Sequence, residues 1–415
     1  MENYIEKIKK AKKASYSLAL LSTVEKNMAL EKIAEGIEKN MEKILEENSK
    51  DMERGKEKGL SKAILDRILL NEKRIKDIIR SIEDIIRLPD PVGEIISMQK
   101  RPNGMLVGQM RVPLGVIALI YEARPNVTVD GALLAIKSGN AIVLRGSADA
   151  LYSNIILGNI MRSSLKDTMV PEDSIQIIES PEHKVVEEIL QMRDYIDVVI
   201  PRGSANFIKY VMEKAKVPVI ETGAGNNHVY VDNEADFNMA EEIIFNAKVQ
   251  RPSVCNAIEK VLIHKDIAQT FLPRIYKRLR EAGVEIRGCP EARKIIPEIK
   301  EAVEEDWYTE YLDLIIAIKI VSSIDDAIEH INKYNTKHSE AIITNNYQKA
   351  LIFLRNVDAS AVYVNASTRF TDGGEFGLGA EIGISTQKLH ARGPMGLKEL
   401  TTTKYIILGN GQIRT

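Results

Sequence analysis

Residues 114–145 read LGVIALIYEARPNVTVDGALLAIKSGNAIVLR and contain a complete strand–helix–strand unit. Residues 114–120 form an apolar run with the length of a buried strand, and residues 141–145 form a second one. Between them, residues 127–137 have the length and composition of a helix. A helix that joins two buried strands predicts a right-handed crossover, and therefore a parallel sheet.

The same alternation continues on both sides of this unit. Up to residue 220 we expect further strands at 174–178, 197–201 and 217–220. A second alternating series has expected strands that begin at 229 and continue near 260–264, 284–287, 313–321, 341–344 and 360–364. Residues 1 to about 90 have the apolar spacing of amphipathic helices. The chain is therefore predicted to be an α/β protein with two doubly wound parallel-sheet domains in series.

Two β-prone segments lie outside these series. Residues 95–113 contain a turn at 102–104 and predict a small two-stranded excursion. The tail at 400–414 includes TTTKYII (401–407), a segment with no following element in the chain. This tail is expected to pair either with the excursion or with an edge strand of another subunit.

Composition excludes several classes of protein. The 415 residues include 57 Lys and Arg against 59 Asp and Glu, a net charge of −2, whereas a nucleic-acid-binding protein normally has a basic excess. The apolar runs are shorter than the roughly 18 residues of a membrane span, and the N-terminus lacks an apolar signal region. We therefore expect a cytoplasmic protein without membrane contact. Two cysteines and six scattered histidines predict no metal site.

Cys255 is the candidate nucleophile. It lies in QRPSVCN (250–256), between a predicted helix and the strand near 260. Arg251 and Pro252 mark a bend, which places the thiol on a loop where a nearby cation can stabilise a thiolate. The alternative is a small buried apolar side chain. Cys289 has no such neighbours and is expected to be structural or exposed.

Two loops are candidates for binding an anion. Gly203 and Ser204 lead from a predicted strand into a helix, whose N-terminal amides could hold a diphosphate. The alternative is an ordinary N-cap by Ser204. Arg145 ends the strand at 141–145, at the edge where open α/β sheets bind ligands. The alternative there is a surface arginine.

These residues, taken in order, resemble the aldehyde dehydrogenase superfamily. The matching features are YEARPN (121–126), residues 137–147, Gly203-Ser204, ETG (221–223), Cys255, Glu310 and residues 360–365, with Glu221 placed 34 residues before the cysteine. Within the superfamily the chain is similar to the gamma-glutamyl phosphate reductases, also called glutamate-5-semialdehyde dehydrogenases, in residues 112–117, 121–127, 247–256, 367–383 and 390–396. Asn227 departs from the pattern, since many members carry a cysteine before the histidine that follows.

The resemblance implies an enzyme of proline biosynthesis that uses NADPH to reduce L-glutamyl 5-phosphate to L-glutamate 5-semialdehyde and phosphate. Cys255 would form a thioester, and its own backbone amide and the Asn126 side chain would stabilise the oxyanion. Glu221 would be either a general acid and base or a positioning residue. The cationic candidates for the phosphate and α-carboxylate of the substrate are Arg124, Arg251, Arg369, His390 and Arg392. The candidates for the cofactor are Lys137 and Arg145 at the adenosine ribose and its 2′-phosphate, Gly203 and Ser204 at the diphosphate, and Glu310 at the nicotinamide ribose.

The resemblance also implies domains and partners. Residues 1–96 and 114–226 would bind NADP, residues 227–395 would form the catalytic domain, and residues 97–113 and 400–415 would be oligomerisation strands. The expected partners are the small-molecule substrate, further copies of the chain in a dimer or larger assembly, and glutamate 5-kinase in a transient contact. Two alternatives stay open: a hydrolytic aldehyde dehydrogenase that yields a free acid, and a non-catalytic protein that retains the fold.

Overall fold

The computed structural model describes residues 4–414, which divide into two compact units. Unit 1 takes residues 4–221, 377–383 and 395–414, and unit 2 takes residues 222–376 and 384–394. Residues 377–383 thus belong to unit 1, although they lie inside the continuous segment 227–395 expected for one domain. Gly379 packs closely against Leu88, and Glu381 lies 3.9 Å from Arg202, so contacts within unit 1 hold this segment.

Helices form the N-terminal part of unit 1, as the apolar spacing predicts. They are α1 Tyr4–Leu18, α2 Thr23–Lys39, α3 Met41–Glu57, α4 Lys62–Ile68 and α5 Glu72–Arg87. In α5 the buried residues Ile75, Ile78, Ile82 and Ile85 recur at steps of three and four, which gives the helix one apolar face. None of the helices within residues 4–414 combines the length and the apolar character that crossing a membrane requires.

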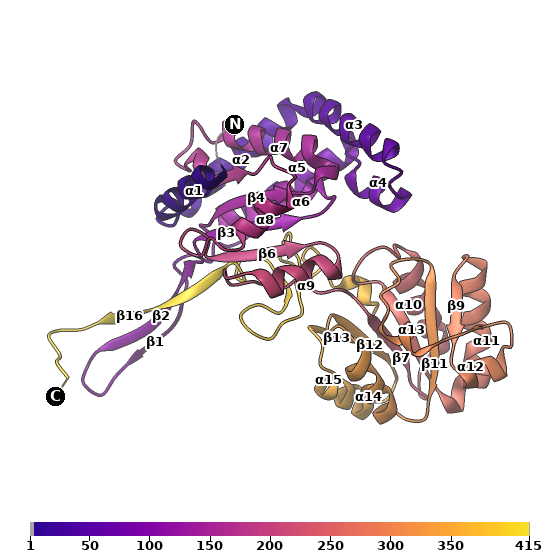
Figure 1. The fold of residues 1–415 in the computed structure, drawn as a ribbon. Coiled ribbons are helices and arrows are strands. Elements are labelled where there is room, and N and C mark those ends of the chain that lie inside the picture. The colour runs from indigo at the N-terminus through magenta and orange to yellow at the C-terminus, as the bar shows by residue number, and fades with distance from the viewer. Residues whose placement is uncertain (1–3, 415) are drawn as a thin grey trace. The chain divides into compact units, whose positions relative to one another are not determined.

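A four-stranded parallel sheet in the order β5-β4-β3-β6 forms the centre of unit 1 (Figure 1). Its strands are β3 Val116–Tyr121, β4 Ala141–Gly146, β5 Ile175–Ile177 and β6 Val198–Arg202, connected by α6 Pro125–Lys137, α7 Leu151–Ser164, α8 His183–Ile189 and α9 Ala205–Lys214. Val116 and Ala118 of β3 pack into the core that α1 and α8 share, whereas Leu119 lies against Gly131 of α6. The predicted parallel sheet with helices on both faces is confirmed.

The predicted strand at 217–220 is wrong. Within the described residues this segment makes one isolated parallel bridge, between Val199 and Val219. Val199 donates to the Pro218 carbonyl and accepts from the Ile220 amide. Pro218 has no N–H to extend the ladder, so an apolar run with the composition of a strand stays a short bridge.

A seven-stranded parallel sheet in the order β10-β9-β11-β8-β7-β12-β13 forms the centre of unit 2. Its strands are β7 Asn227–Val231, β8 Ile258–His264, β9 Glu285–Gly288, β10 Lys300–Glu301, β11 Ile315–Val321, β12 Ser339–Ile343 and β13 Ala361–Val364. Its helices are α10 Phe237–Val249, α11 Lys265–Glu281, α12 Pro290–Ile295, α13 Glu304–Tyr308, α14 Ile324–Tyr334 and α15 Tyr347–Asn356. Neighbouring residues of β7 face opposite cores, Val229 towards α10 and α11, and Tyr230 towards α14 and α15. The second predicted doubly wound series is confirmed.

The two β-prone segments outside these series pair with each other. β1 Ile95–Lys100, β2 Leu106–Pro113 and β16 Thr401–Leu408 form an antiparallel sheet in the order β1-β2-β16 (Figure 1). The pairing of β16 with β2 runs from Thr401 opposite Pro113 to Leu408 opposite Leu106, which confirms the first of the two alternatives for the tail. The remaining short elements are η1 Ala148–Ala150, η2 Glu172–Ser174, η3 Thr368–Phe370, β14 Ile384–Ser385 and β15 Gly393–Pro394.

Candidate active site

Many of the predicted site residues gather at one edge of each parallel sheet. In unit 1, β3, β4 and β6 run in the same direction, so the residues that follow them lie at the carboxyl edge. In unit 2, β7, β8 and β12 begin beside one another, so the residues that precede them lie at the amino edge. The carboxyl edge carries Arg124, Asn126, Arg145, Gly203 and Ser204, and the amino edge carries Cys255 in the loop before β8.

Arg145 is a buried cation at the carboxyl end of β4. Its side chain is 6% exposed, and Nη2 donates to the carbonyl oxygens of Pro181 (2.8 Å) and Glu182 (3.3 Å). Among residues 4–414, nothing accepts a hydrogen bond from its Nε. Burial lowers the pKa of Arg145. A desolvated guanidinium with a donor to spare is suited to bind a phosphate or a ribose hydroxyl.

Gly203 and Ser204 stand at the start of α9, as predicted. Ser204 is the N-cap residue, but within the described chain its side chain makes no capping bond. Its backbone N–H donates instead to Oε2 of Glu122, at 2.8 Å. A Cβ atom on Gly203 would lie 2.4 Å from the same carboxylate oxygen. The backbone amide of the residue before α9 therefore binds a carboxylate, and a side chain at position 203 would collide with that carboxylate, so the start of α9 accepts an anion.

Lys137 does not reach this edge. Its side chain is fully buried at the end of α6, where Nζ donates to Asn27 Oδ1 (2.5 Å) and to the Ile86 carbonyl oxygen (3.0 Å). Burial is the main cause of a lowered pKa for Lys137. The ammonium group thus connects α6 to α2 and α5, and this burial argues against the predicted contact of Lys137 with a ribose.

Arg124 and Asn126 occupy the start of α6. Arg124 is the N-cap residue, and the exposed Asn126 donates from Nδ2 to Oδ2 of Asp130, at 3.1 Å. Burial raises the pKa of Asp130 to about 6, and the Asn126 bond opposes that rise. Glu221 is half-buried and is the last residue of unit 1 before the chain enters unit 2. Asn126 is therefore an exposed side-chain amide at the start of a helix, with its Nδ2 bonded to Asp130.

Cys255 lies half-buried on the loop between α10 and β8, as predicted. Buried side-chain amides hold the part of the loop that follows the thiol. Asn227 donates to the Cys255 carbonyl oxygen at 2.7 Å, and Asn256 donates to the Thr371 carbonyl oxygen at 2.9 Å. The Asn256 carbonyl oxygen accepts from the Thr368 hydroxyl at 2.7 Å. Sequence analysis missed these asparagine contacts, for which the only signal was the departure at position 227.

Arg369 brings a positive charge to this loop. Its Nε donates to Gln250 Oε1 at 3.0 Å, and its Nη1 donates to Asn256 Oδ1. Burial, and then repulsion from Arg251, lower the pKa of Arg369, while the charge of Cys255 opposes that shift. Arg369 therefore interacts electrostatically with both Arg251 and Cys255.

Glu310 contacts the thiol loop indirectly, through Gly225. Its Oε1 accepts from the Gly225 amide at 2.6 Å. A Cβ atom on Gly225 would lie 1.5 Å from the Cys255 carbonyl oxygen, so the two backbones pack directly against each other. The Thr336 hydroxyl donates to the Ala224 carbonyl oxygen and accepts from the Asn226 amide at 2.9 Å. The segment before β7 is thus a fixed support under the thiol loop.

Arg392 and His390 belong to unit 2 but make different contacts. Arg392 donates from Nη2 to Oδ1 of Asp358 at 2.7 Å, in an ion pair that Lys388 shares. The Arg392 guanidinium is the main cause that lowers the pKa of Asp358 to about 2. His390 is exposed, with a backbone φ of 68°. The structure thus gives Arg392 a carboxylate partner and places His390 at the surface.

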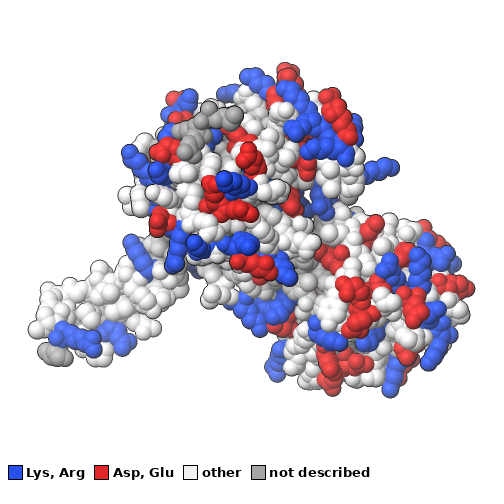
Figure 2. Space-filling model, viewed as in Figure 1, with Lys and Arg blue, Asp and Glu red and all other residues white. Residues whose placement is uncertain are grey.

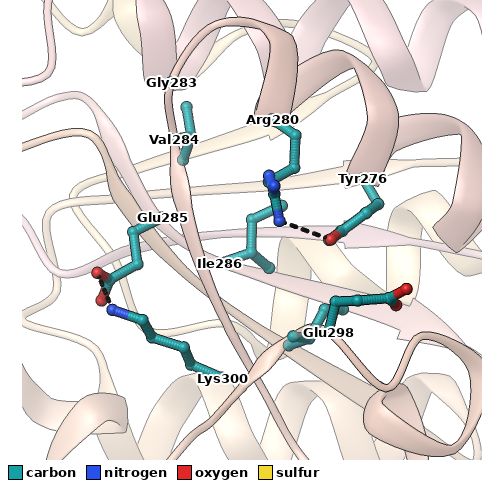
Figure 3. Close-up of a pocket in the computed structure, with 9 residues that line it drawn as sticks. Tyr276, Arg280, Gly283, Val284, Glu285, Ile286, Glu298 and Lys300 are labelled. Carbon is teal, nitrogen blue, oxygen red and sulfur yellow. Dashed lines mark hydrogen bonds and ion pairs between the residues drawn. The ribbon is translucent and has the colours of Figure 1, made fainter.

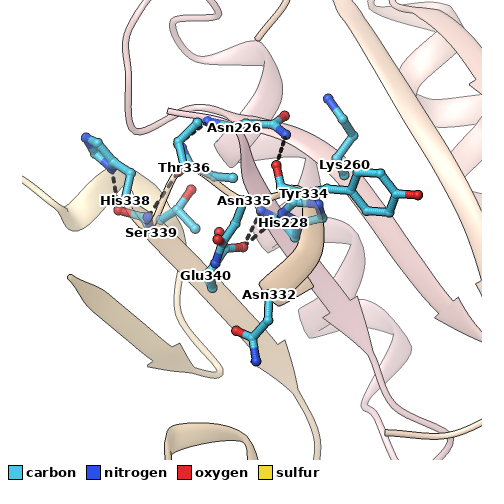
Figure 4. Close-up of polar contacts among 12 residues, drawn as sticks. Asn226, His228, Lys260, Asn332, Tyr334, Asn335, Thr336, His338, Ser339 and Glu340 are labelled. Atoms are coloured by element: carbon cyan, nitrogen blue, oxygen red, sulfur yellow. Dashed lines mark hydrogen bonds and ion pairs between the residues drawn. The ribbon is translucent and has the colours of Figure 1, made fainter. Parts of the chain in front are cut away.

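A neutral histidine–carboxyl pair lies inside unit 2 (Figure 4). His228 and Glu340 are both fully buried, and Glu340 Oε2 lies 2.7 Å from the His228 amide and 3.1 Å from its Nδ1. Burial holds the pKa of His228 well below and that of Glu340 well above the ordinary range. The pair therefore carries no net charge and fixes the start of β7 against β12.

The predicted residues do not line the cavity of about 290 Å³ in unit 2 (Figure 3). That cavity lies beside β9 and β10, where Arg280 donates to the Tyr276 hydroxyl and Lys300 pairs with Glu285. Within the described residues, no three His, Cys, Asp or Glu side chains are placed to hold a metal ion.

Comparisons with known proteins agree with this arrangement. A model of the aldehyde dehydrogenase family matches residues 1–301. A gamma-glutamyl phosphate reductase from Dictyoglomus thermophilum is 76% identical over 414 residues, covering 100% of both chains. The crystal structure of a gamma-glutamyl phosphate reductase from Thermotoga maritima has a TM-score of 0.96 and 52% identity, covering 99% of each chain. An acetylating aldehyde dehydrogenase from Geobacillus thermoglucosidasius, 17% identical with a TM-score of 0.73, covers 99% of this chain and 97% of its own, and has the same fold.

Proposed function

The chain belongs to the aldehyde dehydrogenase family and, within it, to the gamma-glutamyl phosphate reductases, and from this membership we propose its reaction. The enzyme reduces L-glutamyl 5-phosphate to L-glutamate 5-semialdehyde and phosphate, the second step of proline biosynthesis. The carrying observation is Cys255, half-buried on a loop that buried amides fix and that interacts electrostatically with Arg369. Identity of 76% over the full chain supports the substrate.

Cys255 acts as the nucleophile. Its thiolate attacks the acyl carbon of the substrate, the carbon–phosphate oxygen bond breaks, and phosphate leaves with the electron pair, which gives a thioester. Hydride addition to the thioester carbon gives a thiohemiacetal, whose collapse releases the semialdehyde and restores the thiol. We assign the oxyanion donors to the Cys255 backbone amide and to the exposed side chain of Asn126, because such donors stabilise charge that develops in the transition state.

Unit 1 provides the residues for the cofactor, which we propose to be NADPH. This cofactor supplies the hydride when it is bound. Arg145, with its free Nε, would hold the 2′-phosphate or the adenosine ribose, and Gly203 and Ser204 would hold the diphosphate. Glu310 of unit 2 would bind the nicotinamide ribose. Lys137 is omitted from this set because its ammonium group is buried between helices.

Two cations beside the thiol are assigned to the anions of the substrate. Arg251 and Arg369 interact with Cys255 or with each other, so a phosphate that leaves the acyl carbon departs into positive charge. Arg124 and His390 remain candidates for the α-carboxylate. We assign Arg392 a structural role in its ion pair with Asp358. Glu221 is proposed to position the substrate or to transfer a proton.

The antiparallel sheet of β1, β2 and β16 is proposed as the surface for assembly with further copies of this chain. In Figure 2 this sheet is mostly free of charged side chains. Its exposed apolar side chains are Ile95, Ile96, Met98, Leu106, Tyr405, Ile407 and Leu408. An apolar surface of this kind on an open sheet favours pairing with another copy. We further propose a cytoplasmic location and a transient contact with glutamate 5-kinase, which would supply the acyl phosphate.

The test is the reverse reaction. The purified full-length chain is given glutamate 5-semialdehyde and NADP⁺, with and without inorganic phosphate, and NADPH formation is recorded beside a Cys255→Ala variant. We expect turnover that requires phosphate and that the variant lacks. Turnover that is indifferent to phosphate would overturn the proposal in favour of a hydrolytic dehydrogenase that yields a free acid.

A further inference from the structure

We propose that Asn227 is a positioning residue for the Cys255 thiol. Its side chain is fully buried at the start of β7. Nδ2 donates to the carbonyl oxygens of Cys255 and Ala257, both at 2.7 Å, and Oδ1 accepts from the Ser339 amide at 3.0 Å. One side-chain amide therefore ties both ends of the turn that follows the thiol to β7 and to β12.

The hydrogen bond to the Cys255 carbonyl controls the direction of the thiol. The peptide unit between Cys255 and Asn256 is planar, so fixing its carbonyl oxygen fixes the whole unit. The Cα of Cys255 is part of that plane and also carries the backbone nitrogen of Cys255 and the Cβ to which Sγ is bonded. Asn227 thereby sets the orientation of the nucleophile and of the N–H that we assign to the oxyanion. The assignment of these two roles rests on the proposed function.

The groups around Asn227 further restrict the position of the Cys255 carbonyl. Gly225 approaches the Cys255 carbonyl so closely that an added Cβ would lie 1.5 Å from its oxygen. The Gly225 amide donates to Glu310, and the next residue of the same turn, Asn256, donates from its side chain to the Thr371 carbonyl oxygen. The Cys255 carbonyl thus lies between the Gly225 backbone, which packs closely against it, and the Asn227 side-chain amide, which donates to its oxygen.

The neighbouring residue Asn226 offers a matched control. It is also fully buried, and its Nδ2 also donates to two backbone carbonyl oxygens at 2.7 Å, those of Trp307 and Tyr334 (Figure 4). The two side chains have the same chemistry, the same burial and the same number of donated bonds. They differ in what they hold, because Asn226 anchors the ends of α13 and α14, whereas Asn227 anchors the thiol turn.

The experiment compares Asn227→Leu with Asn226→Leu in the full-length chain. The measurements are the melting temperature, kcat and KM, and the pH profile of Cys255 alkylation by iodoacetamide, read peptide by peptide. Cys289 is the internal reference, since it is buried and burial raises its pKa. We expect both variants to lower the melting temperature. Asn227→Leu alone is expected to change the Cys255 profile and to lower kcat about tenfold to a hundredfold, with KM changed less than about threefold.

A graded variant strengthens the test. Asn227→Ser keeps one hydroxyl donor and is expected to recover part of the kcat that Asn227→Leu loses. If a leucine variant does not fold, Asn227→Ser and Asn226→Ser are compared in the same way. The proposal is overturned if the Asn227 variant keeps the wild-type profile and kcat, or if the Asn226 variant changes both equally. Alkylation needs no substrate, so a wild type that lacks phosphate-dependent turnover would contradict the proposed function without deciding this test.

Discussion

The carboxyl edge of the unit 1 sheet and the amino edge of the unit 2 sheet obtain positive charge by different means. At the carboxyl edge helices begin: α6 and α9 start within four residues of β3 and β6, and their N-terminal ends carry a partial positive charge. At the amino edge helices end: α10, α14 and α15 stop at Val249, Tyr334 and Asn356. Helix ends present carbonyl oxygens and a partial negative charge, which would oppose a thiolate. The amino edge therefore takes its positive charge from arginine side chains.

The same contrast explains the asparagines of unit 2. The last carbonyl oxygens of a helix lack partners inside the helix, so other donors must supply them. Asn226 donates to the Tyr334 carbonyl at the end of α14, and Asn332 donates to the Asn356 carbonyl at the end of α15. Asn227 and Asn256 extend this pattern to the thiol loop. We expect an edge held by side-chain amides to be rigid, whereas an edge where helices begin offers the positive ends of those helices to a ligand.

The largest effect is expected from adding one methyl group at each edge. Gly225→Ala places Cβ against the Cys255 carbonyl, which is backbone and cannot move aside, so we expect a loss of about 3 kcal/mol in unfolding free energy and loss of activity. Gly203→Ala meets the end of the flexible Glu122 side chain and is expected to cost less than about 1 kcal/mol. Urea unfolding of both variants measures the difference. Equal losses would show that the two edges do not differ in rigidity.

A smaller effect is expected from removing one cation at each edge. Arg369→Met removes the charge that interacts with Cys255, so alkylation of this thiol at pH 7 is expected to slow about tenfold, with its profile moved to higher pH. Arg369→Lys keeps the charge but loses the paired bonds to Gln250 and Asn256, so its rate of Cys255 alkylation should lie between those of the wild type and Arg369→Met.

The counterpart at the other edge is Arg145→Met. This variant removes the buried cation of unit 1 and is expected to weaken NADPH binding about tenfold without any change in Cys255 alkylation. Fluorescence titration with NADPH and peptide-resolved alkylation separate the two readouts. An Arg145 variant that slows alkylation, or an Arg369 variant that does not, would contradict the assignment of one role to each edge.

Sequence reasoning succeeded where one segment carries the information. The apolar runs predicted the strands of both sheets except the two-residue, charged β10, and the Arg-Pro bend placed Cys255 on a loop. The strand predicted at 217–220 is wrong because Pro218 lacks the N–H that a longer ladder needs, although the run has the apolar composition of a strand. Sequence reasoning misplaced Lys137 because α6 is buried on nearly all sides, so its pattern does not show which way the last side chain points. The contact of Asn227 with Cys255 joins residues 28 apart, and no local pattern contains it.

The smallest expected effect concerns one carboxyl group of each unit, whose contributions to the free energy of unfolding should change with pH in opposite directions. Burial raises the pKa of Asp130 in unit 1 to about 6, so ionising this group opposes folding, and its contribution to stability falls as the pH rises from about 4 to about 6 and stays constant above that. Arg392 lowers the pKa of Asp358 in unit 2 to about 2, so that carboxylate stabilises the fold at neutral pH and loses this effect as the pH falls below about 4.

At pH 7, Asp130→Asn should raise the unfolding free energy by about 1 kcal/mol and Asp358→Asn should lower it by a similar or smaller amount, because both groups are partly exposed. Urea midpoints at pH 7, 5 and 4 test this, with the exposed Asp194→Asn as the control that should change nothing. If both variants changed the unfolding free energy at pH 7 in the same direction, the two carboxyl groups would not differ in how they affect stability. The contrast between the two edges would then not extend to their acidic residues.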